Sequence, residues 1–195
     1  MIRPLQSLGP NYFEKMFEQT DDPWNLESSD YERAKHAHTV RALGGRIYMN
    51  AFEIGCAKGI LTRQLAPFCR DLLAVDVSTI ALRAARERCE TVEHVSFANM
   101  VVPSLLPARS FDLVILSEVA YYWADEDLKR VSVWLGSHVR SGGDILLVHW
   151  TGATDYPQSG DDAVEKLRTM LGDGVLVVTA ERMPLYRLDL WRRVS

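Results

Sequence analysis

Apolar and polar positions along the chain fall into two alternating patterns. Short, largely apolar runs predict strands at about residues 48–54, 71–76, 93–98, 111–116 and 145–150. Stretches whose apolar residues recur every three or four positions predict helices at about residues 59–67, 78–90, 125–139 and 161–171. Two final strands, at about residues 174–180 and 185–192, are close enough in sequence to pair antiparallel. The alternation predicts an α/β fold with a doubly wound, mostly parallel sheet of seven strands and helices on both faces.

Residues 1–46 precede the alternating pattern and predict a separate helical segment. Asn11 is suited to cap a short helix, and Ser28 or Ser29 to cap a second helix, because their side-chain oxygens accept hydrogen bonds from free N–H groups. We expect this segment to form a cap beside a core of residues 47–195, within a single domain overall.

The helical segment carries polar and aromatic residues with helical spacing. Trp24 follows a break at Pro23, and Tyr31, Lys35 and His38 recur at i, i + 4 and i + 7, so they share one helix face. Packing against the sheet accounts for the bulk of the segment. The aromatic and cationic groups favour a lid over a substrate pocket, with Trp24, Tyr31 and Lys35 as substrate-binding residues.

Two glycines stand where the first predicted strand meets the following helix. Gly55 and Gly59 let the backbone approach a ligand closely, and a helix N-terminus presents free N–H groups. Asp76 ends the next predicted strand, 21 residues after Gly55, about where a nucleotide-binding βαβ unit places a carboxylate for ribose hydroxyls. These residues favour a nucleotide-like ligand over a plain turn.

The spacing of this loop argues against two common nucleotide sites. A dinucleotide site needs G-x-G-x-x-G, whereas Ala57 stands between Gly55 and Gly59. A phosphate-binding loop needs a lysine after its last glycine, whereas Lys58 precedes Gly59. A nicotinamide-dependent dehydrogenase is therefore not favoured.

The stretch from Glu53 to Gly59 resembles motif I of class I S-adenosylmethionine (SAM)-dependent methyltransferases, (D/E)-x-G-x-G-x-G. Its middle glycine is Ala57 here, a departure that a slightly wider turn would absorb. The resemblance implies a Rossmann-like sheet whose last strand is antiparallel, with SAM as cofactor and S-adenosylhomocysteine as product. It also implies that Glu53, Gly55, Ala57 and Gly59 form the cofactor loop and that Asp76 holds the ribose.

Composition limits the classes of partner. The 195 residues carry a formal net charge of −4, with a pI of about 5.7 and 47% hydrophobic residues. This charge argues against nucleic acid as a substrate, and no apolar run reaches membrane-spanning length. Three widely spaced cysteines, Cys56, Cys69 and Cys89, suggest a reducing cytoplasm. His36 and His38 point to different helix faces, so they predict no metal site.

Ligands of an open α/β sheet bind at the carboxyl ends of its strands. This rule adds further cofactor-binding candidates after successive strands, namely Cys56, Val77, Asn99, Met100 and Ser117. Methyltransferases often carry an Asp at the place of Asn99, where it accepts from the adenine amino group. The Asn99 amide oxygen is suited to accept the same bond, and the Met100 N–H to donate to the ring.

The catalytic candidates follow the fourth and fifth strands. Methyl transfer from a sulfonium is an in-line displacement, so the protein mainly positions the acceptor and controls its proton. Glu118 is suited to take that proton or to orient an amine, Tyr121 and Tyr122 to shape the methyl channel, and His149 to act as a second base. A solvated acid, packing tyrosines and a satisfied histidine are the structural alternatives.

Several stretches resemble the NodS family more narrowly. They are residues 52–57, 65–69 and 117–122, with the upstream segment at Asp22-Pro23-Trp24 and Tyr31, and the resemblance covers roughly residues 10–150. NodS enzymes N-methylate the free amine of a de-N-acetylated chitooligosaccharide during nodulation-factor synthesis. The resemblance implies an acceptor cleft lined by His149, Trp150 and the loop at Tyr156, where aromatic faces stack on sugar rings.

The favoured function is therefore N-methylation of an amine on a sugar or related small molecule, by a cytoplasmic monomer or homodimer that binds neither nucleic acid nor membrane. O-methylation of a sugar or natural-product hydroxyl is the alternative within the enzymes, and it would need a stronger base. A degenerate SAM-fold scaffold or partner protein is the alternative of another class. The substitutions at Ala57 and Asn99 leave that alternative open, whereas Asp76 and Glu118 argue against it.

Overall fold

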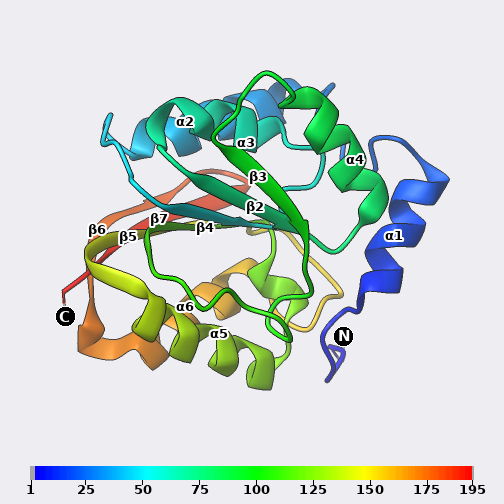
Figure 1. Ribbon diagram of the computed structural model, residues 1–195. Coiled ribbons are helices and arrows are strands. Elements are labelled where there is room, and N and C mark those ends of the chain that lie inside the picture. Colours follow the sequence, from blue (N-terminus) through cyan, green and yellow to red (C-terminus); the bar gives the residue numbers. More distant parts are fainter. Residues whose placement is uncertain (1–2, 195) are drawn as a thin grey trace. The chain divides into compact units, whose positions relative to one another are not determined.

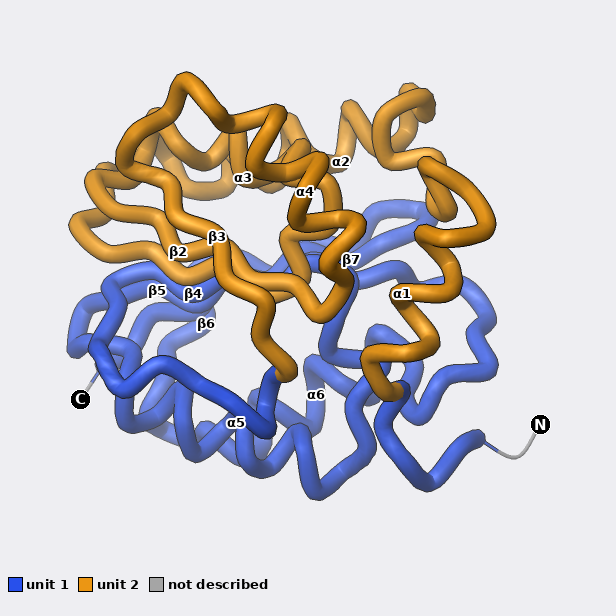
Figure 2. The backbone as a smooth tube through the Cα atoms, turned by 45° about the vertical axis from the view of Figure 1, so that its right-hand side comes forward, with its two compact units in different colours: residues 1–8, 102–195 blue, residues 9–101 orange. Residues whose placement is uncertain are grey.

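The computed structural model of the chain describes residues 3–194 and divides into two compact units, which Figure 2 draws in different colours. Unit 1 is made of residues 1–8 and 102–195, and unit 2 of residues 9–101. An N-terminal arm thus belongs with the C-terminal half of the chain. The predicted division into a cap of residues 1–46 and a core of residues 47–195 stays a prediction.

The strands of the described chain form a seven-stranded sheet in the order β3-β2-β1-β4-β5-β7-β6 (Figure 1). Neighbouring strands are parallel in β1–β2, β2–β3 and β4–β5, and β7 is antiparallel to both β5 and β6. The predicted fold class, a Rossmann-like sheet with an antiparallel last strand, is confirmed. The strands are Ala51–Ile54 (β1), Leu72–Asp76 (β2), Val95–Asn99 (β3), Phe111–Ser117 (β4), Val139–Trp150 (β5), Val175–Arg182 (β6) and Tyr186–Arg193 (β7).

The helices lie between these strands and before the first of them. They are Pro10–Gln19 (α1), Asp30–Ala42 (α2), Ile60–Leu65 (α3), Thr79–Arg88 (α4), Asp125–His138 (α5) and Gly160–Leu171 (α6). Three short 3-10 helices accompany them at Ala66–Phe68 (η1), Ala120–Tyr122 (η2) and Gly172–Gly174 (η3). Only the 3-10 helices and the exact ends differ from the expected helix pattern.

Serine side chains set the beginnings of three helices. Ser29, Ser78 and Ser159 accept hydrogen bonds from the N–H groups of Glu32, Ala81 and Asp162, respectively. The predicted cap at Ser29 is confirmed. The predicted cap at Asn11 is wrong, because α1 begins one residue earlier at Pro10, whose ring fixes a helical φ and needs no N–H partner there.

Unit 2 packs its helices around the three parallel strands β1, β2 and β3. Helix α4 lies against β2 and β3, with α1 and α3 beside it, and α2 contacts α3. A small apolar cluster of Cys56, Ala74 and Leu82, with the partly buried Phe97, fills the space between the sheet and α4. The expected inward residues of α4, Ala81, Leu82, Ala85 and the following Cys89, are buried. This core fixes the strand ends from which the candidate cofactor residues project.

Unit 1 places α5 and α6 side by side on one face of its strands (Figure 1). The buried Arg187 of β7 holds α6 through polar contacts, because its guanidinium pairs with Asp189 on its own strand and with Asp161 and Glu165 of α6, at 2.7–3.1 Å. Burial acts against the charge of Arg187, but the hydrogen bonds that it donates to Asp189 and Glu165 raise its pKa. The ion pairs therefore fix the helix layer of unit 1.

The connection from α5 to β5 differs from its prediction. The strand was expected at about residues 145–150, but it begins at Val139 and contains Ser141, Gly142 and Gly143. Phe111 pairs with Val139 and Leu113 with Asp144, so residues 140–143 bulge out opposite Asp112. Gly142 has φ +74°, which a bulge of this kind requires. The glycines therefore bend a continuous strand.

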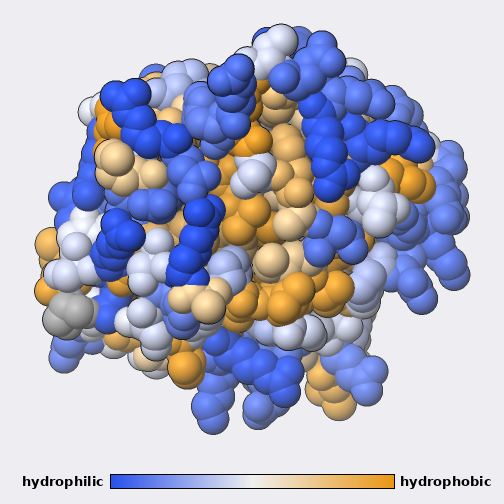
Figure 3. All heavy atoms as spheres, in the orientation of Figure 1, coloured by the Kyte–Doolittle hydropathy of each residue, from blue (hydrophilic) through white to orange (hydrophobic). Residues whose placement is uncertain are grey.

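Large apolar side chains are exposed in both units. Hydrophilic side chains cover much of the face drawn in Figure 3, with hydrophobic side chains between them. Large exposed apolar residues are spread along the chain, from Met49 in unit 2 to Leu105 and Leu176 in unit 1. Within the described residues, no helix has the length and apolar character needed to cross a membrane.

Gly59 allows a prediction about the glycine loop. It has φ +74°, and a Cβ there would lie 3.0 Å from the Cα and Cβ atoms of Ala85 in α4. Gly142 has the same φ, with nothing within 4 Å of a Cβ. We expect Gly142→Ala to lose about 1 kcal/mol of unfolding free energy from the left-handed conformation alone, and Gly59→Ala to lose about 1–3 kcal/mol more from the collision with α4. Urea unfolding of both variants measures the difference, and equal losses would show that α4 yields without cost.

Candidate functional site

The loop after β1 adopts three left-handed residues at alternate positions. Gly55, Ala57 and Gly59 have φ values of +79°, +45° and +74°. The turn is therefore not the wider one that we expected to absorb the substitution at Ala57. Instead, Ala57 takes the glycine conformation, at a cost of about 1 kcal/mol for an L-residue. Other contacts must offset this strain.

Asp76 at the end of β2 fastens this loop. One carboxylate oxygen accepts the N–H of Ala57 and the other accepts the N–H of Ser78, both at 2.8 Å. Burial raises the pKa of Asp76, while the N–H groups of Ser78 and Ala57 act in the opposite direction. The side chain thus joins the glycine loop to the first turn of α4.

Glu14 of α1 adds a second carboxylate at the start of α4. Its Oε1 accepts the hydroxyl of Thr79 at 2.5 Å. Burial opposes the charge of Glu14, but hydrogen bonds from the first turn of α4, led by the hydroxyls of Ser78 and Thr79, lower its pKa. A negative charge is favourable at a helix N-terminus, so this contact docks α1 beside the end of β2.

Asn99 and Met100 follow β3 and contact the end of β2. The Asn99 amide nitrogen donates to the carbonyl oxygens of Asp76 (3.1 Å) and Val77 (2.8 Å). With both amide hydrogens used, the amide oxygen is the group left for a ligand. The Met100 N–H donates to the Asp76 carbonyl oxygen at 3.0 Å. Our expectation that this N–H donates to an adenine ring is therefore wrong, because strand pairing has taken it.

Glu53 and Cys56 face the interior. Glu53 is 1% exposed, and burial raises its pKa to about 7, with the Thr62 hydroxyl acting against the rise. The Cys56 thiol lies in the apolar cluster of unit 2, and its N–H donates to Val75 at 3.0 Å. The side chain of Cys56 belongs to the core, and burial raises the thiol pKa well above the usual value, while its part in cofactor binding stays a prediction.

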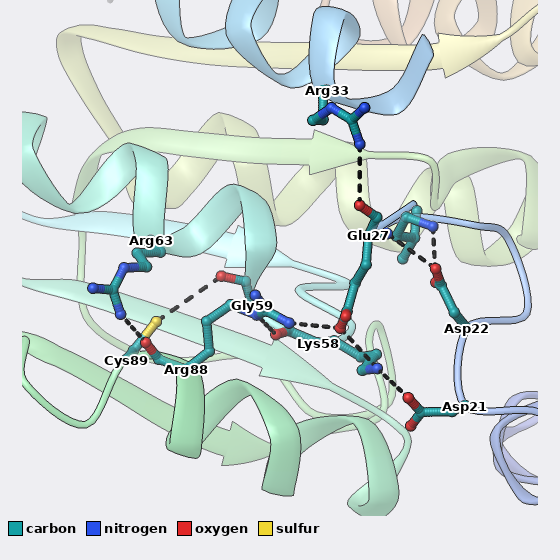
Figure 4. A network of polar contacts seen from close by, with 10 residues as sticks. Asp21, Asp22, Glu27, Arg33, Lys58, Gly59, Arg63, Arg88 and Cys89 are labelled. Carbon is teal, nitrogen blue, oxygen red and sulfur yellow. Dashed lines mark hydrogen bonds and ion pairs between the residues drawn. The ribbon is translucent and has the colours of Figure 1, made fainter. Parts of the chain in front are cut away.

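Lys58 forms a charged cluster that sequence reasoning missed (Figure 4). Its ammonium group lies 2.7 Å from Glu27 and 3.0 Å from Asp21, and Glu27 also accepts from Arg88 at 2.5 Å. We call Asp21, Glu27, Lys58 and Arg88 the Glu27 cluster. Burial acts against the charge of Lys58, but the bonds to Glu27 and Asp21 raise its pKa. No spacing rule links these residues, because they come from a loop, the glycine loop and α4.

A hollow of about 550 Å³ lies over this cluster, lined also by Arg63, Ala84 and Glu87. None of the residues predicted to bind cofactor lines it. Its cations and acids are mixed and already paired in part, so the hollow does not mark the cofactor site.

The residues expected to bind substrate from the first helices have packing contacts. Trp24 meets the ring of Phe17 edge to face, with centroids 5.5 Å apart. Lys35 is 2% exposed, lies 5.2 Å from the centroid of the Tyr31 ring and pairs with Glu32 at 2.9 Å. The helix thus turns the Lys35 side chain inward, and its part in substrate binding stays a prediction.

Glu118 in unit 1 holds a strained backbone position after β4. It follows Ser117, has φ +58°, and its Oε2 accepts the hydroxyl of Tyr121 at 2.7 Å and the N–H of Trp150 at 2.9 Å. A left-handed residue of this type, held by contacts from two segments, is common at functional sites. The bonds fix the carboxylate at the carboxyl ends of β4 and β5.

Three tyrosine rings surround this part of unit 1. Tyr121 stacks on Tyr156 at 5.5 Å and meets Tyr122 edge to face at 4.6 Å, while Tyr122 lies 4.7 Å from Tyr156. Burial raises the pKa of Tyr121 and Tyr122 well above the usual value, so both phenols stay protonated. The N-terminal arm supports the group because Arg3 donates to the Tyr156 carbonyl oxygen at 2.8 Å.

His149 has a structural partner. It is fully buried, its Nε2 accepts the N–H of Ala120 at 3.1 Å, and its ring lies edge to face against Tyr121 at 5.6 Å. A ring nitrogen that accepts this bond is not free to take a proton from an acceptor molecule. The second base predicted at His149 is therefore corrected to a residue that orients η2. Within the described residues, no group of His, Cys, Asp and Glu side chains is arranged to hold a metal ion.

The buried Glu53 predicts a particular dependence of stability on pH. Its folded pKa of about 7 lies above the ordinary 4.5, so between these values the folded chain holds a proton that the unfolded chain has released. Stability should therefore fall as pH rises from about 4.5 to 7, by on the order of 3 kcal/mol for this group. We expect Glu53→Gln to remove this part of the fall, as followed by urea unfolding at pH 5 and pH 8. The exposed Glu93→Gln is the control, and an unchanged slope in Glu53→Gln would contradict the assignment.

Comparison with known proteins matches this geometry to one family. The profile of NodS, nodulation protein S, matches residues 11–146. Nodulation protein S of Sinorhizobium fredii is 33% identical over 114 residues, which are 58% of this chain and 53% of that protein. The Rhizobium tropici protein of the same name is 36% identical over 114 residues, 58% of this chain and 48% of that protein. The chain spans about half the length of the curated relatives it matches.

A solved structure agrees in fold. The crystal structure of N-methyltransferase NodS from Bradyrhizobium japonicum WM9 in complex with S-adenosylhomocysteine superposes with a TM-score of 0.79 and 24% identity, over 93% of this chain and 98% of that one. At this identity the likeness shows the shared fold. The profile match covers more than half of the chain and includes the glycine loop, Asp76 and the segment at Glu118, and the chain therefore belongs to the NodS family.

Proposed function

We propose that this chain is a SAM-dependent methyltransferase that acts on a small molecule, with N-methylation of an amine on a sugar or oligosaccharide as its reaction. The observation that carries the proposal is the glycine loop held left-handed against the Asp76 carboxylate by a 2.8 Å hydrogen bond, in a chain of the NodS family. When bound, SAM supplies an electrophilic methyl group on a sulfonium.

The residues at the end of β2 and β3 fit such a cofactor. The Asp76 carboxylate has about four acceptor positions, and N–H groups of Ala57 and Ser78 occupy one on each oxygen. Each oxygen thus keeps an acceptor position for a ribose hydroxyl. The Asn99 amide oxygen keeps its acceptor positions for an amino group such as that of adenine. We therefore assign Asp76 to the ribose and Asn99 to the base.

The residues of unit 1 fit an amine on a sugar. Glu118 provides a fixed carboxylate, which attracts an ammonium group and accepts a proton that a neutral amine loses on methylation. The rings of Tyr121, Tyr122 and Tyr156 offer aromatic faces and edges of the kind that pack on sugar rings and cations. Trp150 supplies an N–H that fixes Glu118, and we assign His149 to positioning of the same turn.

O-methylation of a hydroxyl is less well supported. A sugar hydroxyl is a poor nucleophile until a base removes its proton, whereas a neutral amine attacks with its own lone pair. His149 already accepts a backbone N–H, and Glu118 already accepts two hydrogen bonds. The site thus offers positioning rather than a strong free base, which favours an amine.

Calorimetric titration with S-adenosylhomocysteine tests the cofactor assignment. We expect the wild-type chain to bind, and Asp76→Asn to bind about 10- to 100-fold more weakly, because charged hydrogen bonds to the ribose are lost. Asp173→Ala, which removes an exposed acid of η3, is the control and should bind as the wild type does. Absence of heat and of a thermal shift in the wild type would favour the scaffold alternative instead.

Two acceptors that differ only in their free amine distinguish N-methylation from O-methylation. We expect methylation of a de-N-acetylated chitooligosaccharide and none of its fully N-acetylated counterpart, which has the same hydroxyls but no free amine. Glu118→Gln, which keeps an acceptor oxygen but loses the charge, should lower kcat about 100-fold. Mass spectrometry locates the methyl group on nitrogen or oxygen. Methylation of both acceptors, with complete loss in Glu118→Gln, would favour the O-methyltransferase.

A further inference from the structure

Lys58 stands between Ala57 and Gly59 in the glycine loop, and its side chain reaches the segment between α1 and α2. The residue is 5% exposed, and its ammonium group contacts two acids of that segment, Glu27 at 2.7 Å and Asp21 at 3.0 Å. A buried ammonium group without a partner is strongly unfavourable. The Lys58 ammonium group needs these acids as partners, and it therefore binds the glycine loop to this segment.

Glu27 and Arg88 close a ring around the backbone of Lys58. The same Glu27 oxygen that contacts Lys58 also accepts from the Arg88 guanidinium at 2.5 Å. The Arg88 Nε in turn donates to the Lys58 carbonyl oxygen at 2.9 Å. Figure 4 shows both cations directed at the Glu27 carboxylate. One carboxylate thus orients the side chain of Lys58 and, through Arg88, its peptide group.

Glu27 is the better fixed of the two acids. The Asp21 side chain is 92% exposed, so solvent screens its contact, whereas that of Glu27 is 37% exposed. The Asp22 carboxylate accepts the N–H groups of Leu26 and Glu27 at 2.8 and 3.0 Å. These bonds hold the backbone at Glu27 in a tight turn, and the carboxylate is presented from a defined place.

The ring adjoins the strained residue of the loop. Ala57 directly precedes Lys58 and has φ +45° where glycine would be at ease. On its amide side, Asp76 accepts the Ala57 N–H. On its carbonyl side, Arg88 fixes the carbonyl group of the following residue, Lys58. Ala57 is thus held from both directions by charged side chains.

We propose that Glu27 is a positioning residue for the cofactor loop. Its carboxylate holds Lys58 and Arg88, so that Ala57 keeps the left-handed conformation of the glycine it replaces. Glu27 acts on the glycine loop and not on a ligand directly. Its effect on SAM binding rests on the proposed function. The Glu27 cluster thereby offsets the departure of this chain from the glycine motif.

A double-mutant cycle in S-adenosylhomocysteine binding tests the coupling. We expect Glu27→Gln to weaken binding about tenfold in the wild-type background, as a loss of roughly 1.4 kcal/mol would. In the Ala57→Gly background, glycine adopts the left-handed conformation without strain. The same change should therefore weaken binding by only about twofold. Equal effects in both backgrounds, or no effect in either, would overturn the proposal.

Glu87→Gln is the matched control. Glu87 lines the same hollow and its change removes the same charge, but it contacts neither Lys58 nor Arg88 through a hydrogen bond or ion pair. Its binding should stay within about twofold of the wild type, since an exposed charge contributes little. An effect equal to that of Glu27→Gln would show that only the local charge matters, which would also overturn the proposal.

Amide hydrogen exchange separates this proposal from the proposed function, because it needs no cofactor. We expect exchange across residues 55–59 of the cofactor-free chain to be faster in Glu27→Gln than in the wild type or in Glu87→Gln. Glu27→Asp, which keeps the charge, should exchange at a rate closer to that of the wild type. If the wild type fails to bind S-adenosylhomocysteine, the proposed function fails while the exchange result still decides the role of Glu27. Unchanged exchange in Glu27→Gln contradicts the positioning role whether or not the cofactor binds.

Discussion

The bond between the Asp76 carboxylate and the Ala57 N–H is the constraint on which the candidate cofactor site depends. It crosses 19 residues of sequence and connects the end of β2 to a loop that takes left-handed backbone conformations at alternate positions. The second oxygen of Asp76 fixes the start of α4 through Ser78. A charged acceptor with two N–H donors is one of the stronger polar contacts available to a protein. The loop, the helix and the carboxylate therefore keep one geometry together.

The spacing of the apolar residues predicted the fold because it shows which positions are buried. In this fold, the packing of helices on the sheet buries the strands. The antiparallel β7, the caps at Ser29 and Ser78 and the inward face of α4 follow from this local chemistry. What the sequence could not show is the partner of each polar group. The pairing of Lys58 with Glu27 joins residues far apart in sequence, and no periodicity reports such a contact.

The same limit explains the corrections to the candidate site. His149 and Met100 stand at strand ends, where open acceptors and donors are expected, but each bonds a neighbouring segment instead. Lys35 was placed correctly on a helix face, and the face proved to be buried. Strand-end position therefore selects the region of a site, while the number of unused donors and acceptors decides which residues can meet a ligand. By that measure Asp76 and Asn99 remain.

The arm at residues 3–8 has a consequence for the order in which the chain can fold during synthesis. Unit 2 is one continuous stretch, so all of its residues exist once residue 101 has been made. Unit 1 is interrupted, since Arg3 bonds Tyr156 across 153 positions and Leu8 bonds Tyr122. The ribosome therefore completes unit 2 first, and the arm can pack only after the rest of unit 1 has been made. Closing so long a loop costs entropy, and a folded unit 2 within that loop lowers the cost. A unit 2 that folds early would therefore shorten the search by which the arm reaches the tyrosine group.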